Sequence, residues 1–354
     1  MADPLLPGAT IGILGGGQLG RMLSVAAARL GFKCHIFEPG AAPPAGQVAD
    51  RVTTAGYDDH DALAGFARSV DVVTYEFENI PSAALDILEK LVPVRPNRRA
   101  LEVSQDRLTE KRFLNNLDLA TAPFSNVESM DDLNHASKKI GTPAILKTRR
   151  LGYDGKGQMR LNEVTKPASA FDDLAGAAAI LEGFVDFTHE VSVIGARGVD
   201  GSVACFDPGQ NVHNNGILHS THVPADLTAS QRTDAVLIAA KILSALDYVG
   251  VLGVELFVTK SGFIVNEIAP RVHNSGHWTQ NGCAVDQFEQ HIRAIAGWPL
   301  GDGKRHSDVE MQNLIGDDVD LVSDMARDGS CAIHLYGKSE TKPGRKMGHV
   351  NKIQ

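Results

Sequence analysis

The sequence predicts an α/β protein in which a doubly wound N-terminal domain precedes a central domain and a small β-rich C-terminal unit. Residues 10–38 read as a strand, a glycine-rich turn, a helix and a second strand, which is how a doubly wound sheet begins. Two apolar segments at 251–259 and 263–268 enclose Lys-Ser-Gly, which is typical of a long β-hairpin. Glycine and proline cluster at 297–303 before short strand-like segments, so we expect a further boundary there.

Length and composition favour a soluble globular protein of two or three domains. The chain has 354 residues, 43% hydrophobic and 22% charged, and its formal net charge is −9, which argues against nucleic acid as the main partner. No apolar run reaches about 18 residues and no signal-peptide pattern is present, so we expect no membrane partner and a cytoplasmic location. The scattered cysteines favour reduced thiols at positions 34, 205, 283 and 331.

The N-terminal segment carries a possible anion-binding turn. A strand at 10–14 leads into the sequence GGGQLG at 15–20, and a helix over 21–30 precedes a strand at 33–37 that ends in Glu38. This arrangement satisfies the dinucleotide fingerprint G-x-G-x-x-G, so an NAD-binding domain is a serious alternative. The fingerprint is weak alone, because any anion can bind at the N-terminus of such a helix.

Two acidic residues follow the third predicted strand. That strand spans 70–75 and ends in Glu76, with Glu78 just beyond it. Ligands of doubly wound sheets bind at the carboxyl ends of the strands, which points to residues 15–19, Glu38 and Glu76. The alternative is that Glu76 and Glu78 are solvated loop charges.

The central segment contains a lysine before a basic, glycine-rich loop. A helix over 104–116 with Ser104 as its N-cap precedes a strand at 142–146 that leads into Lys147. The loop at 148–158 holds three glycines, which favours a flexible cover over phosphate groups, although a charged surface hairpin is the alternative. It is not a Walker A motif. Further strands and helices are expected at 178–181, 189–194, 227–246 and 285–295.

The hairpin predicts a pair of facing carboxylates. We expect a three-residue loop at 260–262, with Gly262 in the left-handed conformation that glycine adopts without strain. Pairing centred on Ser261 places Glu255 directly opposite Glu267, with Cβ atoms about 5 Å apart. Two such carboxylates repel each other. A hard cation such as Mg²⁺, shared with substrate phosphates, explains the pair. An exposed hairpin with two solvated glutamates is the alternative.

A basic pair follows the hairpin. Pro270 ends the strand, and Arg271 and His273, two positions apart, would face one side of an extended chain. An arginine fork binds small planar oxyanions. A zinc pair formed by His273 and His277 is the alternative, but no third ligand lies nearby. We interpret the histidines at 213, 219 and 222 as structural.

In this order, the features resemble the ATP-grasp carboxylate-amine ligases over essentially the whole chain. Four motifs are similar to those of the 5-(carboxyamino)imidazole ribonucleotide synthetase family, which uses ATP to carboxylate a purine precursor. They are GGGQLGRM at 15–22, GYDGKG at 152–157, NEIAPRVHNSGH at 266–277 and PGRK at 343–346. The last two are the most specific.

The resemblance implies an ATP-grasp architecture with three domains. A Rossmann-like pre-ATP-grasp domain is expected at 1–103 and an ATP-grasp domain at 104–296, with its lid at about 118–185. A small C-terminal β-rich domain is expected at 297–354.

The resemblance also implies roles around ATP. Arg107 and Lys147 would hold the phosphates, Glu182 and Val185 would meet the adenine, Glu190 would meet the ribose, and Glu255 and Glu267 would bind Mg²⁺. Many relatives carry a metal-binding asparagine where this chain has Ala269, and Asn266 is the candidate to replace it. Mn²⁺ is expected to substitute for Mg²⁺.

Further roles concern bicarbonate and 5-aminoimidazole ribonucleotide. Arg271 and His273 would hold bicarbonate, and Tyr153 and Asp154 would cover the amine, with Asp154 as candidate base. The ribonucleotide would be held by Gln18, Leu19, Glu76, Lys338 and Arg345, with Lys346 in a catalytic role.

The resemblance thus implies an ATP- and bicarbonate-dependent carboxylation through carboxyphosphate, carried out by a homodimer. Three alternatives stay open. A sister ligase would use a different acid and amine. An NAD-dependent oxidoreductase leaves the two hairpin glutamates without a role. A non-catalytic nucleotide-binding module does not need Arg271 and His273.

Overall fold

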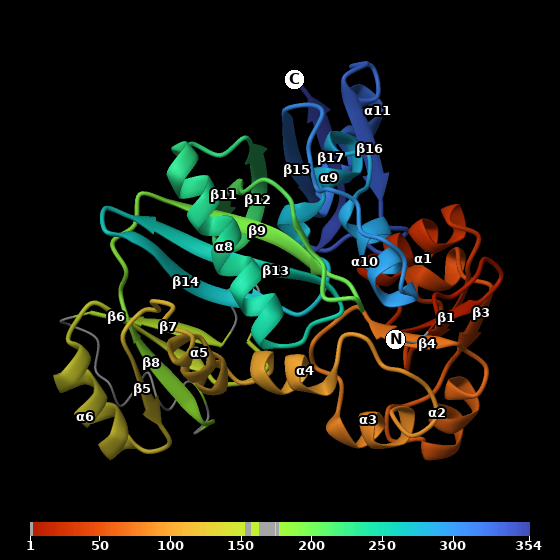
Figure 1. Ribbon diagram of the computed structural model, residues 1–354. Helices are drawn as coiled ribbons and strands as arrows, with labels where there is room; N and C mark the ends of the chain where they lie inside the picture. The colour runs from red at the N-terminus through yellow and green to blue at the C-terminus, as the bar shows by residue number, and fades with distance from the viewer. Residues whose placement is uncertain (1–2, 153–156, 163–173, 175–176) are drawn as a thin grey trace.

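The computed structural model describes residues 3–152, 157–162, 174 and 177–354. Within these residues the strands form three sheets, which divide the chain into an N-terminal part, a lid and a large central body (Figure 1). The α/β fold class predicted from the sequence is confirmed.

The N-terminal part is a parallel sheet covered on both faces. Its strands are β1 (Thr10–Leu14), β2 (Lys33–Phe37), β3 (Arg51–Thr53) and β4 (Val72–Tyr75), in the order β3-β2-β1-β4. Helix α1 (Gln18–Arg29) packs on one face, and α2 (His60–Ala67) and α3 (Ser82–Leu88) pack on the other. The carboxyl ends of β1 and β4 are adjacent, as the doubly wound prediction requires.

The lid is an antiparallel sheet of four described strands with one helix against it. The strands are β5 (Phe124–Val127), β6 (Ala144–Thr148), β7 (Gln158–Leu161) and β8 (Ala179–Gly183), in the order β5-β8-β6-β7. Helix α6 (Met130–Ile140) covers one face through a small apolar core. In Figure 1 the lid lies at the lower left, at the opposite end of the molecule from β1–β4.

The central body is a nine-stranded sheet that also includes the C-terminal strands. Its main order is β14-β13-β9-β11-β12-β15-β17-β16, with β10 paired to β9. The strands are β9 (His189–Arg197), β10 (Val203–Cys205), β11 (Gly209–Asn214), β12 (Ile217–Val223), β13 (Gly250–Thr259), β14 (Gly262–Ala269), β15 (Val309–Ile315), β16 (Cys331–Leu335) and β17 (Lys346–Ile353). Strands β15, β16 and β17 of the predicted C-terminal unit therefore extend the sheet that carries the hairpin.

Two helices flank the central sheet. Helix α8 (Ala229–Ala245) begins at Thr228 with a capping box and packs against β9 and β13. Helix α10 (Gln287–Ala296) lies between the sheet and α1, so one apolar core joins the central body to the N-terminal part. Short helices α9 (Thr279–Gly282) and α11 (Val322–Met325) complete the described helices of this region.

The helix predicted over 104–116 is in fact two helices. Helix α4 (Arg98–Ser104) ends where the prediction begins, and α5 (Arg107–Asn116) starts three residues later. Asp106 is the N-cap of α5 and accepts the amides of Leu108 and Thr109. Ser104 cannot serve as the cap, because its hydroxyl donates back to the Leu101 carbonyl. The prediction missed the stronger acidic cap two residues downstream.

The hairpin pairs its glutamates as predicted, but through a different register. Thr259 pairs with Gly262, so the turn holds two residues, and the predicted three-residue loop is wrong. The register then shifts between Glu255 and Leu256, where Asn266 is the extra residue of a β-bulge. The bulge compensates for the shorter turn and restores Glu255 opposite Glu267.

Candidate active site

The facing carboxylates lie in a charged cleft. Glu267 pairs with Arg107 at 3.0 Å. Glu255 lies 3.4 Å from His273 Nε2 and accepts a hydrogen bond from the side-chain Nδ2 of Asn266 at 3.3 Å. Burial, together with the charge of Glu267, raises the pKa of Glu255 to about 7. Burial also opposes ionisation of Glu267, but Arg107 outweighs it and holds that pKa below its usual value. The pair therefore favours a further positive charge.

The donors of this pair suit a hard divalent cation. Carboxylate oxygens are the ligands that Mg²⁺ takes, commonly one or two of them together with substrate phosphates. Within the described chain, no three acidic, histidine or cysteine side chains surround a common point. The residues thus fit a metal that arrives with a phosphate ligand better than one held in a closed protein cage.

A second group of charges centres on Glu182 of β8. Its carboxylate accepts Lys147 Nζ at 2.8 Å and lies 3.5 Å from Lys111 Nζ. Lys147 comes from the neighbouring strand β6, so the strand pairing itself brings the two together. The three side chains are buried, and the two lysines, despite burial, hold the pKa of Glu182 below its usual value. The Glu182 side chain therefore faces the lysines.

The Arg271 guanidinium is held by a residue far away in the sequence. Glu78 accepts Arg271 Nε at 2.7 Å and Nη2 at 3.3 Å. Beside it, His273 Nδ1 lies 2.8 Å from the Ser275 hydroxyl, and burial with the Arg271 charge lowers the pKa of His273 to about 3. His273 is thus neutral at physiological pH. His273 and His277 do not form the alternative zinc pair, because the buried His277 ring contacts Gln287 and His349 instead.

An anion does lie at the glycine-rich turn, but it is the carboxylate of Glu76. This group accepts the backbone amides of Gly17 and Gly20, the latter at 2.6 Å, while Glu38 accepts the amide of Gly16 at 2.8 Å. Burial raises the pKa of Glu76, and the two amides partly offset that effect. The amides that would cradle a dinucleotide pyrophosphate are therefore occupied, which argues against the NAD-binding alternative. Gln18 and Leu19 form the partly buried first turn of α1.

The two ends of the chain meet near this turn. Gln47 accepts Arg21 Nη1 at 2.7 Å and donates to the carbonyl of Gly337 at 2.7 Å. Lys338 Nζ donates to the Lys346 carbonyl at 2.6 Å, and Arg345 Nη1 donates to the Glu340 carbonyl at 3.0 Å. The charge of Lys346 contributes to the lowered pKa of His273, after burial and the charge of Arg271.

The sequence analysis did not assign a role in the site to four charged or titratable residues. Glu78, Glu110 and Lys111 show no periodic signal of their own, and His213 was interpreted as structural. His213 Nδ1 lies 2.9 Å from the Glu190 carboxylate, which outweighs burial and raises the histidine pKa. The hydrogen-bond partners of all four lie far along the chain or on a neighbouring strand.

Several predicted residues have a simple placement. Val185 is partly buried in the connection between β8 and β9. Tyr153 and Asp154 lie outside the described residues.

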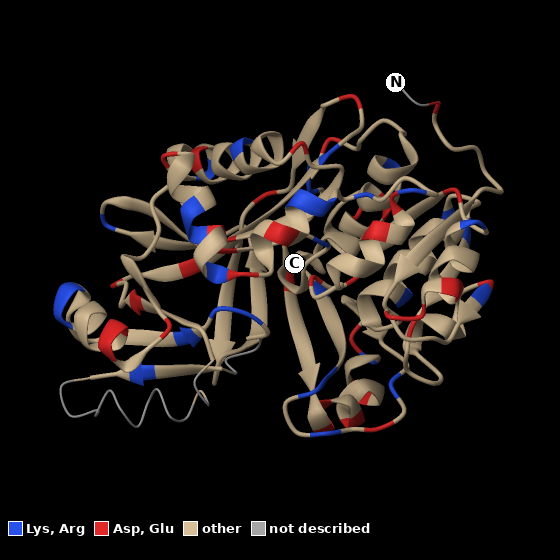
Figure 2. Ribbon diagram, turned by 90° about the horizontal axis from the view of Figure 1, so that it is seen from below, with Lys and Arg blue, Asp and Glu red and all other residues tan. Residues whose placement is uncertain are grey.

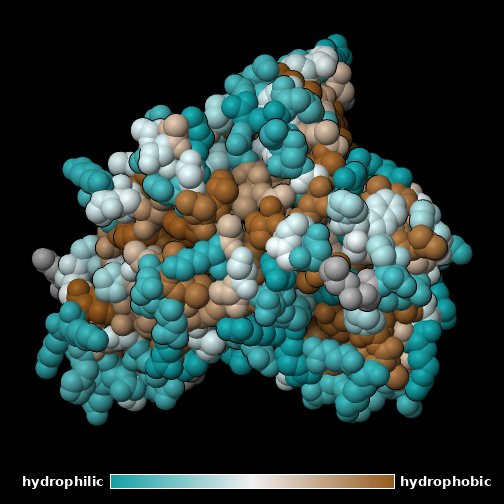
Figure 3. Space-filling view, in the orientation of Figure 1, coloured by the Kyte–Doolittle hydropathy of each residue, from teal (hydrophilic) through white to brown (hydrophobic). Residues whose placement is uncertain are grey.

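In the ribbon of Figure 2, segments with basic residues and segments with acidic residues are interspersed along the described chain. In Figure 3, apolar surface gathers toward the middle of the face and hydrophilic residues toward its lower margin. No described helix has the length and apolar character needed to span a membrane.

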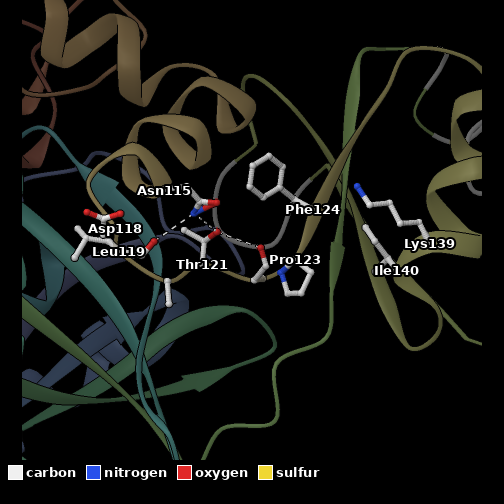
Figure 4. A pocket seen from close by; sticks show the side chains of 10 residues that line it. Asn115, Asp118, Leu119, Thr121, Pro123, Phe124, Lys139 and Ile140 are labelled. Atoms are coloured by element: carbon white, nitrogen blue, oxygen red, sulfur yellow. Dashed lines mark hydrogen bonds between the residues drawn. The ribbon is translucent and has the colours of Figure 1, made fainter.

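One cavity lies away from these charges. It measures about 760 Å³ and opens between α5 and the lid (Figure 4). Its walls include Asn115, Asp118, Leu119, Thr121, Pro123, Phe124, Lys139 and Ile140. A smaller cavity of about 50 Å³ borders Arg107, Glu267, Arg149 and Gly152, where the lid approaches the paired carboxylates. The chemistry predicted from the sequence belongs to this second region.

Family models match three successive segments of the chain. A ribonucleotide synthetase preATP-grasp domain matches residues 8–105, an ATP-grasp domain matches 112–288, and a phosphoribosylaminoimidazole carboxylase C-terminal domain matches 310–354.

Relatives and solved structures agree with these matches. An N5-carboxyaminoimidazole ribonucleotide synthase of Brucella melitensis is 54% identical over 99% of this chain and 98% of its own. An N5-carboxyaminoimidazole synthetase from Staphylococcus aureus, complexed with ADP, has a TM-score of 0.95 and 36% identity, covering 100% of this chain and 95% of that one. An Aspergillus clavatus N5-carboxyaminoimidazole synthase, with ADP and 5-aminoimidazole ribonucleotide, has a TM-score of 0.91 and 28% identity, covering 99% and 95%.

Proposed function

The chain belongs to the family of N5-carboxyaminoimidazole ribonucleotide synthases, and we propose the following division of that reaction among its residues. The enzyme uses ATP and bicarbonate to carboxylate the amine of 5-aminoimidazole ribonucleotide, and it releases ADP and phosphate. The reaction passes through carboxyphosphate and belongs to de novo purine biosynthesis. The observation that carries the proposal is that Glu267 faces Glu255 across the hairpin and lies within electrostatic range of Lys147, Arg271 and His273.

Glu255 and Glu267 hold Mg²⁺ together with ATP phosphate oxygens, and Mn²⁺ can replace it. When bound, the cation neutralises charge that develops on the phosphates during transfer. The support is the buried carboxylate pair, in which Glu255 ionises reluctantly without a cation. Asn266, the bulge residue of β14, donates to the Glu255 carboxylate, and we assign it to ATP binding.

Arg107 and Lys147 bind the ATP phosphates from opposite sides of the cleft. Glu182 orients Lys147 through the 2.8 Å contact instead of meeting adenine with its side chain. The adenine contact is then left to the connection that contains Val185. Glu190, oriented by His213, accepts the ribose hydroxyls.

Arg271 and His273 hold bicarbonate next to the terminal phosphate. A bicarbonate oxygen attacks the γ-phosphorus, the bond to the β-phosphate oxygen breaks, and ADP leaves. Arg271 supplies fixed positive charge to the planar oxyanion. Neutral His273 supplies a hydrogen bond, because its pKa is too low for it to carry charge.

The amine of the ribonucleotide then receives the carboxyl group. Its nitrogen forms the new C–N bond, phosphate leaves carboxyphosphate, and the amine loses a proton. Asp154 is assigned as the base that accepts this proton, and Tyr153 as the residue that covers the amine. Gln18, Leu19, Glu76, Lys338 and Arg345 bind the ribonucleotide, and Lys346 stabilises the leaving phosphate. The support for this grouping is the Gln47–Gly337 contact, which joins the α1 end to the C-terminal basic segment.

We also propose a cytoplasmic homodimer. The support for the cytoplasm is that all four cysteines are free. The support for the dimer is that β16, at one end of the central sheet, has no charged residue in its sequence Cys-Ala-Ile-His-Leu, so this edge is open to pairing with a second chain. Sedimentation velocity of the pure protein tests the dimer, and a monomer at all concentrations would contradict it.

The reaction is tested by measuring ADP release alongside incorporation of labelled bicarbonate. We expect one ADP for each carboxylated product, with both signals lost without 5-aminoimidazole ribonucleotide or Mg²⁺. Incorporation that does not need ATP, or ATP cleavage that does not respond to bicarbonate, would contradict the proposal.

A further inference from the structure

The outer edge of β14 is covered by helix α5 and the residues after it. β14 stands at one end of the central sheet, so its outward backbone groups have no neighbouring strand in the described sheet order. Instead, the Ile268 amide donates to Glu110 Oε1 at 2.6 Å, and the Asn266 carbonyl accepts Lys111 Nζ at 3.0 Å. Further along, the Val265 amide donates to the Ala120 carbonyl at 2.8 Å.

These contacts fall on both sides of Glu267. Asn266 precedes it and is the extra residue of the bulge, while Ile268 follows it. Glu110 and Lys111 are consecutive in α5, so a single helical turn holds the backbone before and after one metal-binding residue. A bulge left without such contacts could relax by one residue, which would turn the Glu267 side chain to the other face of the sheet.

Lys111 also connects this strand to the lid. Its ammonium group lies 3.5 Å from Glu182, which in turn holds Lys147 at 2.8 Å. The metal-binding strand and the phosphate-binding strand therefore share one buried lysine, of which only 1% is exposed.

A purely stabilising role accounts poorly for this arrangement. Glu110 is 2% and Lys111 1% exposed, and burying ionisable side chains commonly stabilises a fold no more than apolar residues of the same size do. Both side chains form hydrogen bonds with the backbone on either side of Glu267. Two apolar side chains at these positions would fill the same space but would not fix the register of β14.

We propose that Glu110 and Lys111 are positioning residues that fix the Asn266 bulge and thereby hold the Glu267 carboxylate opposite Glu255 for the metal. The inference rests on the proposed function, because it concerns the same metal site. It assigns a role to two residues that contact the strand backbone and Glu182.

Four variants separate this role from general stability. Glu110→Met and Lys111→Met keep the size of each side chain and remove its polar end. Glu110→Gln keeps an acceptor for the Ile268 amide, and Arg112→Met is a matched control at an exposed position on the same helix.

Two measurements are made on each folded variant. The first is hydrogen exchange of the segment 263–269 in metal-free protein, which reports the strand itself. The second is binding of Mn²⁺ in the presence of ADP, read from the electron paramagnetic resonance of the free ion. We expect faster exchange and roughly 10- to 100-fold weaker Mn²⁺ binding for the two methionine variants. Glu110→Gln and Arg112→Met should stay within about two-fold of wild type on both measurements.

Lower melting temperatures with unchanged exchange and Mn²⁺ affinity would overturn the inference and leave a stabilising role alone. If a methionine variant does not fold, Lys111→Gln carries the test, because this shorter neutral side chain cannot reach both Asn266 and Glu182. Wild-type protein that binds no Mn²⁺ with ADP would instead contradict the proposed metal site. The hydrogen-exchange measurement needs no metal, so it still tests whether Glu110 and Lys111 fix the bulge at Asn266.

Discussion

Glu255 and Glu267 face each other across β13 and β14 because a bulge at Asn266 shifts the strand register by one residue. The shift lies between the turn and the glutamate pair. Without the bulge, one glutamate would point to the opposite face of the sheet. Arg107 balances one of the two carboxylates, and burial leaves the other reluctant to ionise. The carboxylate pair therefore lacks one neutralising positive charge, which the proposed cation would supply.

The protonation of Glu255 predicts a pH-dependent stability effect in metal-free protein. We expect Glu255→Gln to raise the melting temperature more at about pH 8 than at about pH 5. The pKa of Glu255 is about 7 in the folded chain. It is near 4.3 in an unfolded one, so stability falls as pH rises through that window. At the lower pH the protonated carboxyl already resembles glutamine.

Thermal scans in a metal chelator at both pH values measure this difference. An equal gain at both values would mean that Glu255 is ionised throughout, contrary to this description of the pair.

Arg271 and His273 should separate carboxylation from nucleotide binding. We expect Arg271→Ala and His273→Ala to suppress product formation while ADP binding, measured by calorimetry, changes little. Both residues follow the end of β14, and the Arg271 guanidinium contacts Glu78. Should nucleotide affinity fall as far as product formation, the two residues belong to the nucleotide site or to the fold.

The C-terminal basic segment should recognise the ribonucleotide phosphate. A charge-assisted contact contributes about 1.5–3 kcal/mol, so Arg345→Ala should raise the KM for 5-aminoimidazole ribonucleotide roughly 10- to 150-fold. The KM for ATP should stay nearly constant. Comparing the ribonucleotide with its dephosphorylated nucleoside provides the control: a variant with unchanged preference for the phosphorylated substrate shows that the phosphate is bound elsewhere.

Local patterns predicted the parts of the site that adjoin strong secondary structure. Lys147 ends a strand before a glycine-rich loop, and Arg271 follows a proline that stops another. The glutamate pair was predicted correctly from a wrong turn, because the bulge at Asn266 compensated for one missing loop residue. A bulge has no reliable sequence signature, so that agreement could not have been derived.

Contacts between distant segments could not be predicted. Glu78 and Arg271 are 193 positions apart, and Glu110 lies 158 positions from Ile268. No local pattern states which acid meets which base. For the same reason the sequence did not reveal that β15, β16 and β17 of the predicted C-terminal unit pair into the central sheet.

The shared metal site is tested most directly by Mg²⁺-dependent ATP turnover of Glu255→Gln and Glu267→Gln. Each variant removes one direct ligand, so we expect a loss greater than the roughly 10- to 100-fold typical of residues that only support a ligand. Circular dichroism should show that both variants are folded. Abolished turnover in each folded variant is the predicted result, and near-normal turnover in either one would contradict the assignment of Glu255 and Glu267 to a single metal.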